Sequence, residues 1–365
     1  MGHNHGLCRY LEGTDAGYSL KKWGLWHDRL TGYGARAKVL LQRSLDGGRT
    51  WPEENDVIVY DEGISSAEKH AFLYRHDGPR EPYDMFQPEA VFFFGLTYIP
   101  EERGNIPVCF GLRSPDKGKT WEKVPTVITH RDGDRHLDGE DIFILKNCDP
   151  VICMPDNQTL LAAVVDVIPG GGPMIYTSRD QGITWNFLSQ VTVDQSASGR
   201  FTYEGLLLMP SGELHCYYLH ISSQDLNVEG FKNAICMSVS KDGGKSWSQT
   251  VPIVGDSRQC WKNPGDEGVN YRSPWPMLLE DGRILVVFAR RRKPMGIGGI
   301  LSSDEGKTWS KEFVIRDDAS SGDIGYPVGD QLEDGHIFIA YYYTLPDGNN
   351  FGGARFIASS RFRLR

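Results

Sequence analysis

The sequence predicts an all-β protein, and the prediction rests on composition, a recurrent motif and a recurrent turn. The 365 residues include 42 Gly, 9 Trp, 16 Tyr and 16 Phe, which suit short strands and tight turns better than helices. Apolar residues make up 39% and charged residues 24%, as in globular proteins with a large core. The net charge of −9 disfavours a nucleic-acid or anionic-membrane partner, because either needs a basic face.

The recurrent motif is S-x-D-x-G-x-T/S-W, which we call the box. Its five copies lie at 44–51, 114–121, 178–185, 240–247 and 302–309. Their tryptophans are 70, 64, 62 and 62 residues apart, a period that indicates an array of supersecondary units. Ser and Asp can hydrogen-bond the backbone of a turn, Gly supplies a positive φ, and Trp buries a large ring. Each box therefore predicts a hairpin that is stabilised by its own set of hydrogen bonds, which we call the lock.

The recurrent turn alternates with the boxes and is followed by strand-forming residues. It occurs at 155–165, 210–219, 280–289 and 333–343. Each period thus holds about four short strands, which is the content of a β-propeller blade. Five boxes, a last hairpin (326–343) and a closing strand (355–364) predict a six-bladed β-propeller with four-stranded antiparallel blades. No linker interrupts the pattern, so we expect residues 1–365 to form one domain.

The N-terminus and the cysteines indicate the compartment. No basic segment followed by an apolar run opens the chain, and the apolar run at 91–99 is only strand-sized. The seven cysteines are scattered and form no Cys-x-x-Cys pair, which favours reduced thiols. We therefore expect a cytoplasmic protein, although a secreted protein without its leader would look the same. We expect no cofactor and no metal, because the histidine pairs lie in loop-like segments.

The boxes resemble the Asp-box, or BNR, repeats of the sialidase superfamily, and the resemblance covers nearly the whole chain. It implies a sialidase-like propeller whose boxes lie on outer hairpins, away from the central funnel. Function is therefore sought on the first strand of each blade, which lines the axis. Counting back from the turns gives one polar residue for each of five blades. These residues are Glu89, Asp149, Glu204, Arg272 and Tyr326.

Tyr326 and Glu204 are similar in position to the nucleophile of sialidases and its base. Tyr326 lies eight residues before Asp334, as in that family, and Glu204 is one residue off relative to Gly212. A phenol has a pKa of about 10 and needs a base to attack at neutral pH. A neutral phenol also approaches an anomeric carbon that bears a carboxylate without charge repulsion, and sialidases are an exception to the two-carboxylate rule.

The resemblance also implies a clamp of three arginines for the sugar carboxylate, because the guanidinium fork matches a carboxylate. Arg9 resembles the first arginine, and His220 stands where the second is expected. The third is expected at Arg290, Arg291 or Arg292. Arg272 corresponds to no arginine of the family but suits an anionic ligand.

The sequence therefore predicts a retaining exo-glycosidase that removes a terminal acidic sugar from a glycan. In this hypothesis Tyr326 is the nucleophile, Glu204 its base, and Asp28 or Asp149 the acid/base. The expected partner is a carbohydrate.

Three other hypotheses stay open. One is a glycosidase with two carboxylates, as in the exo-arabinanases of the same superfamily. Its candidate carboxylates are Glu89, Asp149, Glu204 and Glu267. Another is a lyase acting on uronates, with Tyr326, His220 and Arg272 as its reacting groups. The last is a propeller that binds glycans or proteins without catalysis.

Overall fold

The computed structural model describes most of the chain. The described residues are 4–5, 16–21, 38–76, 78–101, 104–133, 145–146, 151–168, 170–195, 199–221, 231–255, 260–261, 271–291, 293–345 and 354–364. The chain divides into two compact units. The N-terminal unit comprises His3–Asp166 and Ile175–Leu188, and the C-terminal unit comprises Val167–Met174 and Ser189–Arg365 together with the first two residues.

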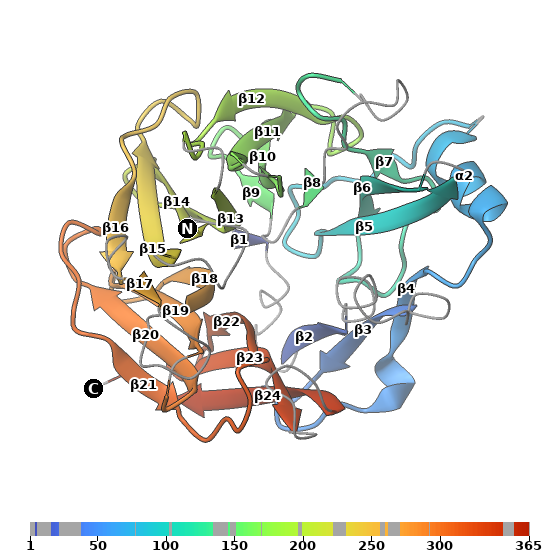
Figure 1. The fold of residues 1–365 in the computed structure, drawn as a ribbon. Coiled ribbons are helices and arrows are strands. Elements are labelled where there is room, and N and C mark those ends of the chain that lie inside the picture. The colour runs from blue at the N-terminus through green and yellow to red at the C-terminus, as the bar shows by residue number, and fades with distance from the viewer. Residues whose placement is uncertain are drawn as a thin grey trace. The chain divides into compact units, whose positions relative to one another are not determined.

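The N-terminal unit contains two three-stranded antiparallel sheets and most of a third sheet (Figure 1). The first sheet is β2 (Ala16–Lys21), β3 (Lys38–Ser44) and β4 (Val57–Asp61), and the second is β5 (Val91–Glu101), β6 (Gly104–Ser114) and β7 (Thr126–Val127). The third runs β1 (Asn4–His5), β9 (Val151–Cys153), β10 (Leu160–Asp166), β11 (Pro173–Ser178) and β12 (Asn186–Gln190), with β8 (Leu145–Lys146) on β10. A short 3-10 turn, η2 (Glu53–Asn55), and the helix α2 (Ser66–Tyr74) connect these strands.

The C-terminal unit contains three antiparallel sheets whose strand order follows the chain. The first is β13 (Arg200–Leu208), β14 (Leu214–Ile221), β15 (Phe231–Ser240) and β16 (Val251–Val254), with β17 (Cys260–Trp261) on β15. The second is β18 (Tyr271–Leu278), β19 (Ile284–Arg290), β20 (Gly296–Ser302) and β21 (Phe313–Arg316). The third is β22 (Gly325–Gln331), β23 (Ile337–Leu345) and β24 (Ala354–Phe362).

The boxes show which strand of a blade each element is. Every box begins at the last residue of a strand, and in the complete sheets β13–β16 and β18–β21 that strand is the third. By the same rule, β2–β4 and β5–β7 are second, third and fourth strands. The sheet β22–β24 carries no box, but β22 has the register shift and turn-glycine spacing of the first strands β13 and β18, so β22–β24 are taken as first, second and third strands. The prediction of antiparallel propeller blades is thus confirmed. Among the described residues only part of the six sheets has all four strands, so a closed ring of six blades and a single domain stay predictions.

The predicted lock is present in all five boxes. In the first, Ser44 Oγ donates to Asp46 Oδ1 at 2.7 Å, Gly48 N donates to Ser44 Oγ at 2.9 Å, and Thr50 Oγ1 donates to Asp46 Oδ2 at 2.7 Å. The other four boxes repeat these bonds. A glycine is required at position 182 for two reasons. The φ of Gly182 is +80°, and a Cβ there would lie 2.3 Å from the ring of Phe92. The motif therefore stabilises the hairpins, and candidate ligand-binding residues are sought on other strands.

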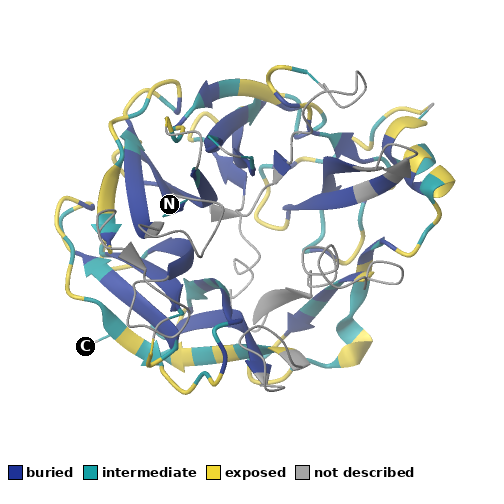
Figure 2. Cartoon of the chain, viewed as in Figure 1, coloured by how far each residue is buried: buried dark blue, intermediate teal, exposed yellow. Residues whose placement is uncertain are grey.

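The core lies in the middle strands of each sheet. All residues of β10 and β19 are buried, because sheet neighbours flank both edges and side chains cover both faces (Figure 2). The fourth strands are much more exposed, as the mixed pattern of β21 shows. Burial of the apolar middle strands is the main stabilising contribution to such a fold.

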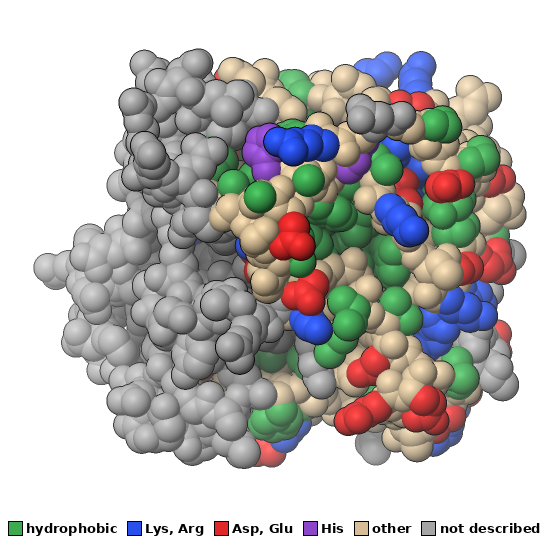
Figure 3. Space-filling model, turned by 90° about the vertical axis from the view of Figure 1, so that its right-hand side faces the viewer, with side chains coloured by type: hydrophobic (Ala, Val, Ile, Leu, Met, Phe, Trp, Pro, Cys, Tyr) green, Lys and Arg blue, Asp and Glu red, His purple; other side chains and the backbone are tan. Residues whose placement is uncertain are grey.

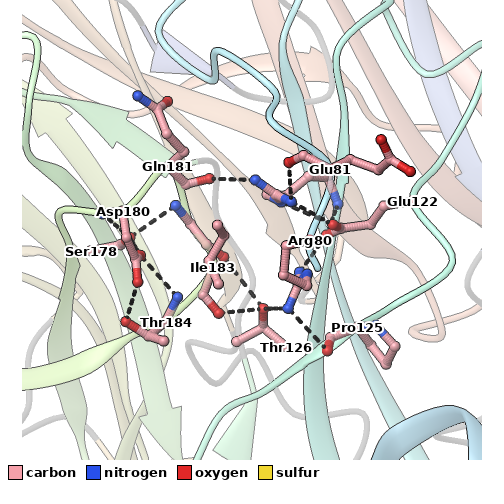
Figure 4. Close-up of polar contacts among 12 residues, drawn as sticks. Arg80, Glu81, Glu122, Pro125, Thr126, Ser178, Asp180, Gln181, Ile183 and Thr184 are labelled. Carbon is pink, nitrogen blue, oxygen red and sulfur yellow. Dashed lines mark hydrogen bonds and ion pairs between the residues drawn. The ribbon is translucent and has the colours of Figure 1, made fainter. Parts of the chain in front are cut away.

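A buried ionic network joins β6 to the third box (Figure 4). Arg113 is 1% exposed and donates from Nε and Nη2 to Glu122 Oε2, at 3.0 and 2.8 Å. It also donates to the carbonyls of Glu81 at 3.0 Å and Gln181 at 3.3 Å. Arg80 Nη2 donates to the other oxygen of Glu122 at 2.9 Å. The charge of Arg113 is therefore matched by a carboxylate and by carbonyl oxygens.

No helix within the described ranges is both long and apolar enough to cross a bilayer. On the face shown in Figure 3, acidic and basic side chains are interspersed over the described part, so this face carries no uniform basic patch.

Candidate functional site

Three first strands of the C-terminal unit share one distortion. The pairing of β13 with β14, of β18 with β19 and of β22 with β23 shifts register at Thr202/Gly205, Arg272/Trp275 and Gly325/Val328. Inside each bulge one non-glycine residue has a positive φ. These residues are Tyr203 at 56°, Ser273 at 42° and Tyr326 at 50°. Such backbone strain costs about 1–3 kcal/mol per residue and clusters at functional sites, so it marks this end of the strands.

The bulges bring Tyr326 against Tyr203. Tyr326 Oη donates a hydrogen bond to Tyr203 Oη at 2.9 Å, and the rings meet edge to face with centroids 5.2 Å apart. Tyr342, on the second strand β23, lies on another side of Tyr326 with a centroid distance of 5.7 Å. Two of these three tyrosines, Tyr203 and Tyr342, were not predicted as site residues.

Tyr342 links a guanidinium to a carboxylate. Its hydroxyl donates to Asp323 Oδ1 at 2.9 Å and accepts from Arg291 Nη2 at 2.7 Å. Arg291 Nε also donates to the carbonyl of Ile324 at 2.9 Å. These bonds hold the guanidinium of Arg291 next to Ile324. That residue directly precedes β22, the strand that carries Tyr326.

Arg272 brings a second guanidinium to the same cluster. It is 7% exposed, and its Nη1 donates to the carbonyl of Tyr271 at 3.0 Å. Burial, followed by the positive charge of Arg291, lowers the pKa of Arg272 to about 10, while Tyr203, Tyr326 and Tyr342 act in the opposite direction. At neutral pH Arg272 is still charged, so two guanidinium groups repel each other in a buried place. An anion between them would relieve that repulsion.

The titration of Arg291 and Tyr326 reflects the same surroundings. Burial lowers the pKa of Arg291, but Tyr342, Tyr326 and Tyr203 outweigh it, and its pKa lies above its ordinary value. Burial, then Tyr203 and Tyr342, raise the pKa of Tyr326 well above 10, and Arg291 only partly opposes them. Tyr326 is therefore a neutral phenol at neutral pH.

Glu204 lies in the same bulge as Tyr203 and is 1% exposed. We predicted its carboxylate as the base for Tyr326. In the structure the hydroxyl bonded to Tyr326 belongs to Tyr203, the preceding residue. The role of Glu204 as a base stays a prediction. Among the described residues, no three His, Cys, Asp or Glu side chains are grouped so that they could hold a metal ion.

Arg290 and Arg291 separate, although they are neighbours in sequence. Arg290 ends β19, where its Nε contacts Glu312 Oε1 and its Nη1 donates to the carbonyl of Pro294 at 3.2 Å. Glu312 also accepts from the hydroxyl of Tyr271 at 2.7 Å. Arg290 is therefore linked through Glu312 to the strand that carries Arg272, whereas Arg291 contacts the tyrosine cluster.

His220 is the penultimate residue of the second strand β14 and also contacts a carboxylate. Its Nε2 lies 2.9 Å from Asp194 Oδ2, and its ring stacks on Phe201 with centroids 4.4 Å apart. The pair accounts for His220 in structural terms, and its predicted contact with substrate stays a prediction.

We predicted that Glu89 lies on a first strand, and the structure shows that this prediction is wrong. It is exposed in the turn before β5, and its carbonyl accepts from Lys117 N in the second box at 2.7 Å. Because β5 is the second strand of its blade, counting back from it led to a turn instead of a first strand. The other predicted residues lie outside the described part of the chain. They are Arg9, Asp28, Asp149, Glu267 and Arg292.

The fold and the boxes define a protein of the β-propeller class. The profile of the BNR repeat-like domain family matches residues 98–339, about two thirds of the sequence. The chain therefore belongs to the BNR repeat-like domain family. No curated protein matches it.

Solved structures confirm the fold. A Dyadobacter fermentans protein of unknown function has a TM-score of 0.62 and 19% identity, covering 93% of this chain and 88% of its own. A leech intramolecular trans-sialidase has a TM-score of 0.53 and 14% identity, covering 91% of this chain. A Hadza microbial sialidase has a TM-score of 0.52 and 19% identity, covering 83% of this chain. This chain spans only 65% of that trans-sialidase and 57% of that sialidase, and such low identities show the fold alone.

Proposed function

We propose that the protein is a retaining glycosidase that releases a terminal, carboxylate-bearing sugar, with Tyr326 as its nucleophile. The observation that carries the proposal is the pair of guanidinium groups, Arg272 and Arg291, around the hydroxyl-bearing cluster of Tyr326. A carboxylate offers two oxygens to guanidinium groups in matching geometry, and a neutral sugar does not. The leech trans-sialidase and the microbial sialidase share the fold and act on a sugar of this kind by their names.

A neutral phenol suits this substrate. The oxygen of Tyr326 can reach an anomeric centre near a carboxylate without the repulsion that an Asp or Glu would meet. As the bond between Tyr326 Oη and the anomeric carbon forms, its proton passes to Tyr203 Oη, along the hydrogen bond already present. Tyr203 passes its own hydroxyl proton to the carboxylate of Glu204. The net result is a glycosylated Tyr326 and a neutral Glu204.

The leaving group needs a proton, and the later hydrolysis needs a base. We propose that Asp28 or Asp149 supplies both, first as the acid and then as the base that activates water. Retention follows, because the sugar is displaced twice at the same carbon.

The test is a release assay over aryl glycosides of sialic and uronic acids, with neutral arabinosides and rhamnosides alongside. We expect release of an acidic sugar only, because a neutral sugar offers no carboxylate to the two guanidinium groups. Tyr326→Phe should lose about 10³-fold or more in kcat, because the covalent route is removed. Glu204→Gln should lose about 10²-fold. The matched control is Tyr341→Phe, whose hydroxyl contacts Ser360 in the same sheet instead of the cluster.

Two results would contradict the proposal. Full activity of Tyr326→Phe would assign the attack to a carboxylate or to water. Release of an unsaturated uronate, seen by its ultraviolet absorbance, would make the protein a lyase.

A further inference from the structure

Ser273 occupies in β18 the position that Tyr203 occupies in β13 and Tyr326 in β22. Each is the positive-φ residue of its bulge, and each lies nine residues before a turn glycine, Gly282 in the case of Ser273. The strand β18 packs against both β13 and β22 (Figure 1). Ser273 therefore lies on the strand between the two strands that carry Tyr203 and Tyr326, whose rings and hydroxyls contact each other.

The hydroxyl of Ser273 is buried and unsatisfied. The residue is 7% exposed, and Oγ has no hydrogen-bond partner among the described residues. Thr202, one residue before Tyr203, has a second such hydroxyl and occupies the place that Arg272 takes in β18. A buried hydroxyl without a partner is destabilising, and native proteins keep few of them without a functional reason.

The charge around Ser273 indicates what would satisfy it. Its neighbour Arg272 is buried and lies within electrostatic range of Arg291 and of the three tyrosines. A ligand drawn there by two guanidinium groups is an anion, and a carboxylate can accept from guanidinium and hydroxyl donors together.

We propose that Ser273 is a substrate-binding residue whose hydroxyl donates a hydrogen bond to the carboxylate held by Arg272. The choice of a sugar carboxylate rests on the proposed function, but binding of the anion does not require catalysis. The contrasting explanation is steric: Ser273 is small so that Tyr203 and Tyr326 can meet. The two explanations differ in what removal of the hydroxyl does.

The experiment measures binding of N-acetylneuraminic acid and D-glucuronic acid to the full chain by titration calorimetry, with D-glucose as the neutral probe. The variants are Ser273→Ala and, as a matched control, Ser238→Ala, a buried serine whose hydroxyl contacts Tyr218. We expect Ser273→Ala to weaken binding of a sugar acid about tenfold, since one hydrogen bond to a charged group is lost. Ser238→Ala should bind as the wild type does.

Thermal unfolding of the same variants separates binding from folding. Ser273→Ala deletes an unsatisfied hydroxyl, so its Tm should be no lower than that of the wild type. Ser273→Gly also relieves the positive φ and should raise the Tm by roughly 2 °C, while it loses the same affinity. A stabilised protein with weakened binding is the pattern expected of a binding residue held under strain.

The outcomes are distinct from those of the release assay. Unchanged affinity in Ser273→Ala would overturn the proposal and leave the steric explanation. Failure of the wild type to bind either sugar acid would also overturn it. Loss of binding in Ser273→Ala without any glycosidase activity in the wild type would refute the proposed function and uphold this one.

Discussion

Two buried arginines, one in each unit, are surrounded in opposite ways. Arg113 in the N-terminal unit contacts the carboxylate of Glu122 twice and two backbone carbonyls. Arg272 in the C-terminal unit lies near another arginine and three phenols, and its pKa is lowered to about 10. The first charge is neutralised by the protein itself. The second lies beside another positive charge, where the proposed function would bring an anion to stabilise it.

The largest expected effect is on stability, from Arg113→Met. The substitution leaves the carboxylate of Glu122 buried without this partner, so unfolding should become easier by about 3–5 kcal/mol. Urea denaturation followed by tryptophan fluorescence measures it. Activity below the unfolding transition should be retained, and a loss of less than about 1 kcal/mol would mean that Arg80 alone compensates for the charge of Glu122.

The opposite pattern is expected from Arg272→Met. Removing a guanidinium that repels Arg291 should leave the urea midpoint unchanged or higher. The kcat/KM for an acidic substrate should fall about 10²–10³-fold, because the anion loses a preorganised charge. Arg113→Met serves as the reciprocal control. A variant that unfolds as readily as Arg113→Met would show that Arg272 is structural too.

The smallest expected effect concerns the aspartates of the boxes. Their negative charge is stabilised by hydrogen bonds within the box instead of by an arginine or a bound ligand. Hydrogen bonds from Ser246 and Ser240 lower the pKa of Asp242 to about 2, below its value in an unfolded chain. A depressed pKa contributes stability that is present above the unfolded-state pKa of about 4 and is lost as pH falls through the folded-state value. Wild type should therefore lose more stability than Asp242→Asn when unfolding is measured at pH values descending from about 4 to 2. Parallel pH profiles would show that Asp242 contributes nothing in this range.

The fold was predictable because the boxes repeat a local geometry that needs only adjacent residues. The site was predictable in part, for a reason visible in the bulges. The family spacing matched Tyr326 but placed Glu204 one residue off relative to Gly212, whereas the residue nine before the turn glycine in each strand is Tyr203, Ser273 or Tyr326. An inserted residue in a strand shifts the alternation of side chains, and the sequence carries no mark of it except this common spacing.

The arginine run shows a second limit. Arg290 and Arg291 differ by one position, yet one side chain contacts Glu312 and the other Tyr342. Sequence spacing identified the segment, but the partner of each side chain depended on where β19 ends. Tyr342 and Asp323 could not be found from motifs, because their role depends on pairing between strands that only the fold brings together.

The agreement between strand order and chain order in the C-terminal unit has a consequence for how the chain folds. The described strands of each sheet there follow one another along the chain, so their backbone contacts join residues close in sequence. Contacts of short sequence separation form fast, and a chain leaving the ribosome can complete one sheet before the next is synthesised. The first strand of each sheet carries one strained residue, Tyr203, Ser273 or Tyr326. Because each bulge is defined by pairing with the second strand, we expect it to form only after that strand has paired. We therefore expect the candidate site to be complete only when the last of these three sheets has formed.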